Sequence, residues 1–182
     1  MIAIRRARAR DAPGIAAVHV ATWRSAYAGL LPDEFLGRLS VIRLAGQYDR
    51  SIRMGLGMFV AINASDASDA SGADPALVGF TSARRSRSDW LGDGEVETLY
   101  VLDDWQNQGI GGALLRASGK FLVALGCRSA YAWVLRENPA GFFYQRLGGK
   151  CIATSMTHVG GQAIPQVAYS WDPIETLLDV DA

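Results

Sequence analysis

The sequence predicts a single α/β domain in which a mixed, mostly antiparallel sheet is flanked by helices, in the order βααβββαβαββ. The chain has 182 residues, the length of one domain, and its 49% hydrophobic residues are enough for one large core. Early strand-like runs that would pair antiparallel are followed by one segment in which a helix separates two strands. This pattern indicates a single βαβ crossover within a largely antiparallel sheet. We expect the domain to occupy residues 1–172 and a C-terminal tail to follow over residues 173–182.

The first elements have clear start and stop signals. Residues 2–8, IAIRRAR, alternate apolar and polar side chains as a strand does. A helix over residues 12–27 follows, since Asp11 is a good N-cap and Pro13 falls in the first turn. The segment GLLPDEF interrupts it, and Asp33 starts a second helical stretch that runs through LGRLSVIRLAGQYDRSI.

The later elements follow the same logic. The segment 64–75, ASDASDASGADP, is small and polar, so we expect a mobile loop between two paired strands. A helix over 109–125 shows a helical spacing of apolar residues and ends at Gly126. The other predicted elements are strands at 58–63, 76–85, 95–102, 129–135, 150–159 and 163–171, and a short helix at 139–147.

Composition narrows the class of protein. Lys+Arg and Asp+Glu both number 18, so the net charge is zero and we expect no nucleic-acid partner and no anionic membrane. The two cysteines form neither a disulfide framework nor a metal cluster. The charged N-terminus lacks the apolar stretch of a signal peptide, and no run is long enough to span a membrane. We therefore expect a cytoplasmic protein.

The segment DDWQNQGIGGALL, residues 103–115, joins a predicted strand to a predicted helix. The first turn of a helix carries free N–H groups, and glycines let a phosphate approach them. A Walker A loop needs Lys and Ser/Thr after its last glycine, but Ala113 follows Gly112. A Rossmann fingerprint needs a small residue where Leu114 stands. Both patterns fail, and a tight turn without any ligand stays open as the alternative to an anion site.

A third pattern, Gln/Arg-x-x-Gly-x-Gly/Ala, fits residues 106–111. It resembles the pyrophosphate-binding motif of the GNAT family of N-acetyltransferases. The stretch EVETLYVLDDWQNQGIGGALL resembles the family's fourth strand and following helix, VLRENPAGFFYQRLGGK resembles an Asn-Pro…Phe-Tyr-x-x-x-Gly-Gly segment of a bacterial branch, and HVATWRSAYAGLLPDEF resembles that branch's first-helix region. The resemblance covers roughly residues 2–171. It implies a GNAT-like fold and an acetyl-CoA-dependent N-acetyltransferase that moves an acetyl group directly to a primary amine.

The resemblance implies acetyl-CoA as cosubstrate and no metal. In the family the pantetheine arm lies between two splayed strands, and backbone amides hold the pyrophosphate. The implied cofactor-binding residues are Leu99, Tyr100, Val101, Gln106, Asn107, Gln108, Gly109, Ile110, Gly111, Gly112, Ala113 and Asn138. Gln106 stands where arginine is frequent, so a charge-assisted contact is lost. Asn138 equally fits the N-cap of a helix that starts at Pro139.

Tyr144 matches the tyrosine that protonates the departing CoA thiolate in the family. A phenol with a pKa near ~10 keeps its proton at neutral pH and can donate it. The alternative is a core aromatic residue beside Phe142 and Phe143. The N–H of Tyr100 or Val101 would polarise the acetyl carbonyl.

Glu97 and Glu95 are the candidate general bases. They share one face of a strand, because side chains alternate, and we favour Glu97 as the one nearer the expected splay. A solvated strand glutamate is the alternative. His19 lies near Trp23 in the region that lines the acceptor side in relatives, and a packed helix residue is its simpler reading.

Two other classes of function remain open from the sequence. One is a non-catalytic acyl-CoA-binding module that acts as a sensor or scaffold, and the other is a nucleotide-binding domain that uses the same turn. The acceptor amine, on a small molecule or on a peptide or protein, is not defined by the sequence. Homodimers are common in the family, and no stretch of this chain decides that point.

Overall fold

The computed structural model describes residues 1–64, 76–88 and 90–179. Most of the predicted loop, residues 65–75, lies outside the described residues. The strands are β1 (Ile2–Arg6), β2 (Gly57–Asn63), β3 (Leu77–Arg85), β4 (Gly94–Val101), β5 (Ala130–Leu135), β6 (Lys150–Val159) and β7 (Gln162–Trp171). The helices are α1 (Ala12–Ala26), α2 (Asp33–Gly37), α3 (Val41–Arg53), α4 (Ile110–Ala124), α5 (Ala140–Arg146) and α6 (Glu175–Leu178), with 3-10 turns η1 (Ala9–Asp11) and η3 (Asp103–Trp105).

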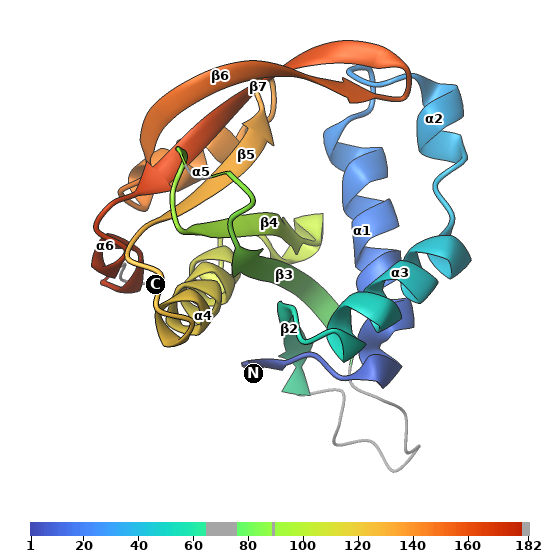
Figure 1. The fold of residues 1–182 in the computed structure, drawn as a ribbon. Helices are drawn as coiled ribbons and strands as arrows, with labels where there is room; N and C mark the ends of the chain where they lie inside the picture. The colour runs from blue at the N-terminus through green and yellow to red at the C-terminus, as the bar shows by residue number, and fades with distance from the viewer. Residues whose placement is uncertain (65–75, 89, 180–182) are drawn as a thin grey trace.

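The strands form one seven-stranded sheet in the order β1-β2-β3-β4-β5-β7-β6. Each neighbouring pair is antiparallel except β4 and β5, which are parallel. Helix α4 connects these two strands across one face of the sheet (Figure 1). The predicted mixed, mostly antiparallel sheet with a single crossover is therefore confirmed.

The structure departs from the expected element order at one place in the first half. The helical stretch expected from Asp33 onward is two helices, α2 and α3. Ser40 between them has an extended backbone, and its hydroxyl accepts a hydrogen bond from the Arg43 N–H at 3.3 Å. A serine at this position caps a new helix rather than continuing the old one, which explains the break.

The segment expected as a C-terminal tail begins with the short helix α6. Ile174 and Leu177 are fully buried in the cluster that also holds Leu122 of α4. A Cβ on Gly119 would lie 2.5 Å from the Leu177 side chain, so this glycine allows α6 to pack closely on α4.

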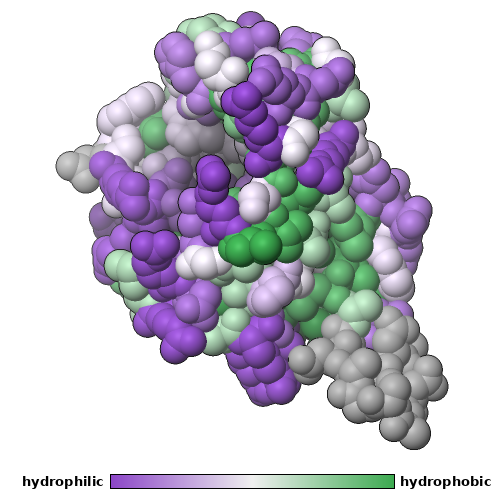
Figure 2. All heavy atoms as spheres, turned by 90° about the vertical axis from the view of Figure 1, so that its right-hand side faces the viewer, coloured by the Kyte–Doolittle hydropathy of each residue, from purple (hydrophilic) through white to green (hydrophobic). Residues whose placement is uncertain are grey.

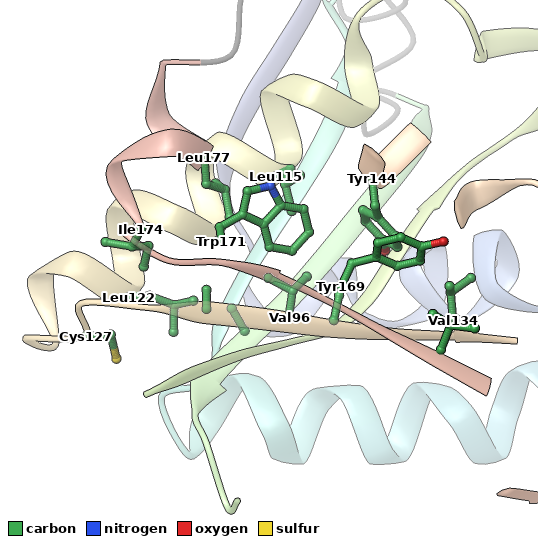
Figure 3. Close-up of a cluster of buried hydrophobic side chains, with 14 residues drawn as sticks. Val96, Leu115, Leu122, Cys127, Val134, Tyr144, Tyr169, Trp171, Ile174 and Leu177 are labelled. Carbon is green, nitrogen blue, oxygen red and sulfur yellow. The ribbon is translucent and has the colours of Figure 1, made fainter. Parts of the chain in front are cut away.

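Helices cover both faces of the sheet. Helix α4 packs on β1 to β4, whereas α1 packs on the opposite face over β3 and β4, with α3 against α1 (Figure 1). The largest cluster of buried side chains lies between α4, α5, α6 and the central strands, and Trp171, Tyr169 and Tyr144 lie together in it (Figure 3). These layers fix the positions of β4, of the start of α4 and of α5.

The chain between α1 and α2 closes one end of the sheet. Tyr27, Leu31 and Leu36 are buried there, and they pack against Leu135 at the end of β5 and Ile164 of β7. The end of α1 therefore reaches across from the β4 side of the molecule to the β5 side.

Candidate active site

Strands β4 and β5 pair only at their first residues. Gly94 lies opposite Ala130 and Glu95 opposite Tyr131, and no further pair joins these strands among the described residues. Strand β5 instead stays paired with β7 over its whole length. The two parallel strands thus diverge, and the splay expected from the sequence is present.

Strand β4 carries a β-bulge at Glu97. The neighbours Val96 and Thr98 lie opposite Ala83 and Ser82, which are adjacent on β3, so Glu97 is the extra residue. A bulge turns two successive side chains toward the same side of a sheet. Glu97 and Thr98 accordingly line one common cavity.

The backbone groups of β4 alternate between β3 and the open side. The Thr98 carbonyl accepts a hydrogen bond from the Thr81 hydroxyl at 2.8 Å, and the Leu102 N–H donates to the Val78 carbonyl at 2.9 Å. Both anchors point toward β3. Because successive residues of a strand point in opposite directions, the backbone of Val101 points toward the splay.

The start of α4 is a row of free backbone donors. Gly109 is the N-cap residue with φ 76°, and Asn107 also has a positive φ, 59°. The N–H groups of residues 107–112 donate no hydrogen bond to any described residue. They lie at the positive end of the helix dipole, an arrangement that binds anions such as phosphate.

The side chain of Gln106 is used within the protein. Its amide nitrogen donates to the Val101 carbonyl and to the Asp103 carboxylate, each at 3.1 Å. Gln106 therefore ties the glycine segment to the end of β4. The side-chain amide nitrogen of Gln106 is therefore engaged with β4 and the turn that follows it.

A cation that the sequence reading missed lies close to this row of donors. Arg116 is one turn further along α4, and a Cβ on Gly112 would lie 3.8 Å from its guanidinium. The neighbouring Gly111 instead faces α5, since a Cβ on it would lie 3.1 Å from the Phe143 ring. The spacing of four residues between Gly112 and Arg116 on a helix is the signal that could have revealed this cation.

Tyr144 is on α5 and is 5% exposed. Its ring packs against Phe143. It also packs against Tyr169 and Trp171 (Figure 3). Burial raises the pKa of its phenol, and the hydroxyl donates to no described residue. The alternative of a core aromatic residue is therefore present in the structure, and the role of the Tyr144 hydroxyl as a proton donor stays a prediction.

Arg84 lies between the two candidate bases. Its guanidinium is 2.7 Å from the Glu97 carboxylate and 3.4 Å from that of Glu95. Both glutamates therefore lie on one face of the strand, as the sequence predicted. Burial raises the pKa of Glu97, while Arg84 opposes that rise. Glu95 is the last residue of β4 that pairs with β5. Of the two glutamates, only Glu97 lies beyond it, in the part of β4 that diverges from β5.

Asn138 is engaged at both ends of its amide. Its oxygen accepts from the Ala140 N–H at 2.9 Å, which caps α5, and its nitrogen donates to the Tyr27 hydroxyl at 2.7 Å. The capping alternative is therefore present in the structure. The second contact joins α5 to the end of α1 across the splay.

Aromatic rings line the β4 side of α1. His19 packs near Trp23 and Tyr100, and its Nδ1 lies 2.6 Å from the Tyr48 hydroxyl. Burial lowers the pKa of His19 to about 4, so the imidazole is neutral at pH 7. The sequence does not predict the contact between Tyr48 of α3 and His19 of α1, because the two residues are 29 positions apart and no local pattern links them.

One cavity lies beside β4, and another lies beside the end of β5. The larger, about 300 Å³, is bounded by α3 and the sheet, and the smaller, about 50 Å³, lies between Tyr27 and Ile164. Figure 2 looks onto the side of the molecule that carries α2 and α3, where apolar residues gather in one area of the surface. Ile42, at the start of α3, is 87% exposed. Among the described residues, no three potential metal-ligating side chains come together.

Comparisons with known proteins identify the family. A family model for the acetyltransferase (GNAT) domain matches residues 67–148. The chain is 32% identical over 179 residues to the uncharacterized N-acetyltransferase YuaI of Bacillus subtilis strain 168, which covers 97% of this chain and 96% of that protein. The chain therefore belongs to the GNAT family of N-acetyltransferases, and the predicted class of enzyme is confirmed.

Solved structures share the fold. The PaiA N-acetyltransferase of Thermoplasma acidophilum, in complex with coenzyme A, matches with a TM-score of 0.65 and 22% identity, covering 91% of this chain and 98% of that one. YncA of Salmonella typhimurium, solved with its cofactor acetyl-CoA, matches with a TM-score of 0.66 and 18% identity, covering 100% of this chain and 96% of that one.

Among the described residues, none of the helices combines the length and apolarity needed to cross a membrane.

Proposed function

We propose that the enzyme transfers the acetyl group of acetyl-CoA directly to a primary amine. The observation that carries this proposal is the row of N–H groups at residues 107–112, which donate to no described residue and follow a strand whose neighbour diverges from it. A diphosphate at the helix start would leave the pantetheine arm free to follow β4. Beyond Glu95, the backbone of β4 pairs with no described residue of β5, which supports a place for such an arm.

The cosubstrate contacts follow from this arrangement. The N–H groups of Gln108, Gly109, Gly111 and Gly112 would hold the pyrophosphate, with Arg116 adding charge. The backbone of residues 99–101 would line the pantetheine arm. Of the two N–H groups proposed to polarise the acetyl carbonyl, the alternation along β4 favours that of Val101, because Tyr100 points toward β3.

The chemistry is a single acyl transfer. The amine nitrogen bonds to the acetyl carbon, the carbonyl oxygen gains negative charge, and collapse of the intermediate breaks the C–S bond. Before the attack, Glu97 takes one proton from the ammonium group directly or through a water molecule, with Glu95 as the second candidate. Tyr144 gives its phenolic proton to the departing thiolate, and its raised pKa keeps that proton in place beforehand. The resulting phenolate then regains a proton from the nitrogen of the new amide, directly or through water.

A thiol-release assay tests this function. The protein is incubated with acetyl-CoA and a broad panel of small amines, amino acids and peptides, while CoA binding is measured by calorimetry. Thiol release with at least one amine supports the proposal. Tight CoA binding without thiol release across the panel would instead indicate a binding module that senses or scaffolds.

A further inference from the structure

The cavity of about 300 Å³ is built from α3, the segment before β2, and strands β2 to β4. None of its lining residues belongs to the glycine segment. Its lining residues are Tyr48, Ser51, Leu56, Met58, Ser82, Glu97 and Thr98. The volume is at the low end for a ligand site and suits a small molecule rather than a protein segment.

The floor of the cavity is a row of side chains that crosses three strands. Thr98 of β4 lies opposite Ser82 of β3, and Ser82 lies opposite Met58 of β2. Neighbouring strands are ~4.8 Å apart, so this row is roughly 10 Å long. The cavity is therefore elongated across the sheet, with one end at the splayed strand.

The two ends of the row differ in chemistry. At the β4 end are the Glu97 carboxylate and the paired hydroxyls of Thr98 and Ser82, 2.7 Å apart. At the β2 end are Met58, which is 1% exposed, and Leu56. No charged side chain lines that far end among the described residues.

Tyr48 covers the cavity as a fixed wall. Its hydroxyl is 2.6 Å from His19 Nδ1, and its ring packs edge-on against Phe80 with centroids 5.2 Å apart. Helix α3 is thereby held to α1 and to the sheet. The cavity is consequently preformed rather than assembled by a ligand.

We propose that this cavity is the acceptor site and that it binds a small primary alkylamine, with the nitrogen beside Glu97 and the chain extending toward Met58 and Leu56. This inference rests on the proposed function, because it specifies which class of amine the enzyme would acetylate. An alkylamine arrives as an ammonium ion, which a carboxylate and hydroxyl oxygens accept. The bulge places Glu97 and Thr98 directly before residues 99–101, beside which the acetyl group would lie.

The first test measures kcat/KM for n-alkylamines from methylamine to n-octylamine. Each methylene that enters the apolar end stabilises binding by ~0.8 kcal/mol, which predicts a rise of about fourfold per methylene. The rise stops once the chain fills the ~10 Å row. Diamines and ω-amino acids of similar length are poorer acceptors, because their second charge would meet Leu56 and Met58.

Variants locate the effect in the cavity. Leu56→Trp fills the apolar end, so the ratio of kcat/KM for n-hexylamine to kcat/KM for methylamine falls by at least tenfold. Ser51→Phe fills the cavity from α3 and keeps the test valid if the first variant fails to fold. Met54→Trp is the matched control, since Met54 lies two positions away and is 74% exposed.

Calorimetry of n-hexylamine with the wild type and Leu56→Trp, without acetyl-CoA, separates the two proposals. Binding that the substitution abolishes supports the cavity even if no acetyl transfer is found. Thiol release with peptides or amino acids but not with alkylamines would overturn the cavity and leave the acetyltransferase intact. Absence of n-hexylamine binding to the wild type also overturns it.

Discussion

The Arg84 guanidinium lies 2.7 Å from the Glu97 carboxylate and also reaches Glu95 at 3.4 Å. One cation thus holds both candidate bases in place on the bulged strand. It opposes the rise in the pKa of Glu97 that burial causes. Burial therefore raises the pKa of Glu97 overall, and Arg84 limits that rise.

Replacing Arg84 should move the acid limb of the pH–rate profile. A base must be deprotonated to act, so kcat/KM falls as the pH drops below the pKa of Glu97. Arg84→Gln removes the group that lowers this pKa, so the loss of activity begins at a higher pH than in the wild type. Arg38→Gln, which removes an exposed ion pair with Glu34, is the control and leaves the profile unchanged. An identical acid limb in Arg84→Gln and wild type would remove Glu97 as the base.

The Asn138–Tyr27 hydrogen bond should contribute measurably to stability. Asn138→Ala loses the donor to Tyr27, whereas Tyr27→Phe loses the acceptor. A double-mutant cycle by urea unfolding should give a coupling of about 1 kcal/mol. Asn138→Ala also removes the cap and should cost a further ~1 kcal/mol. Strictly additive effects would mean that the two side chains do not act together.

The glycine segment should separate stability from CoA affinity. Gly112→Ala meets no atom closer than 3.8 Å and replaces a helical glycine, so the free energy of unfolding should rise by up to ~1 kcal/mol. The added methyl group lies where we place the pyrophosphate, so the Kd for CoA should rise by at least tenfold. Gly46→Ala on α3 is the matched control, because its Cβ would meet nothing within 4 Å. It should gain the same stability and bind CoA as the wild type does. Unchanged CoA affinity in Gly112→Ala would argue against the backbone site.

Salt should distinguish the roles of Gln106 and Arg116. Arg116→Gln removes a charge near the pyrophosphate, so its effect on CoA affinity should shrink as salt screens the interaction. Gln106→Ala frees the segment from the Val101 carbonyl, and the resulting loss of affinity should not depend on salt. Titrations at low and high ionic strength measure both slopes. A salt-dependent effect at Gln106 would mean that its side chain faces the phosphate after all.

The sequence was sufficient for elements whose signal is local. Alternating residues located β1, the helical spacing located α4, and the Gly109 segment was placed correctly between β4 and α4. The break at Ser40 was missed, because a serine inside a polar helical stretch looks the same whether it caps a helix or continues one.

The candidate site depends more on contacts between distant residues. Asn138 and Tyr27 are 111 positions apart, so no local pattern predicts their hydrogen bond. The bulge at Glu97 is a shift of register against β3, and register is a property of the pair of strands. Tyr48 and Met58 join Glu97 only because α3 folds over the sheet.

Comparison of wild type with Tyr144→Phe tests the central claim most directly, because the hydroxyl is the only group removed. It donates to no described residue, so the ring packing beside Trp171 should persist. With acetyl-CoA and an accepted amine, kcat should fall by roughly 10²–10⁴ while the Kd for CoA stays the same. Full activity in Tyr144→Phe would contradict proton donation by this phenol and leave Tyr144 as a packing residue.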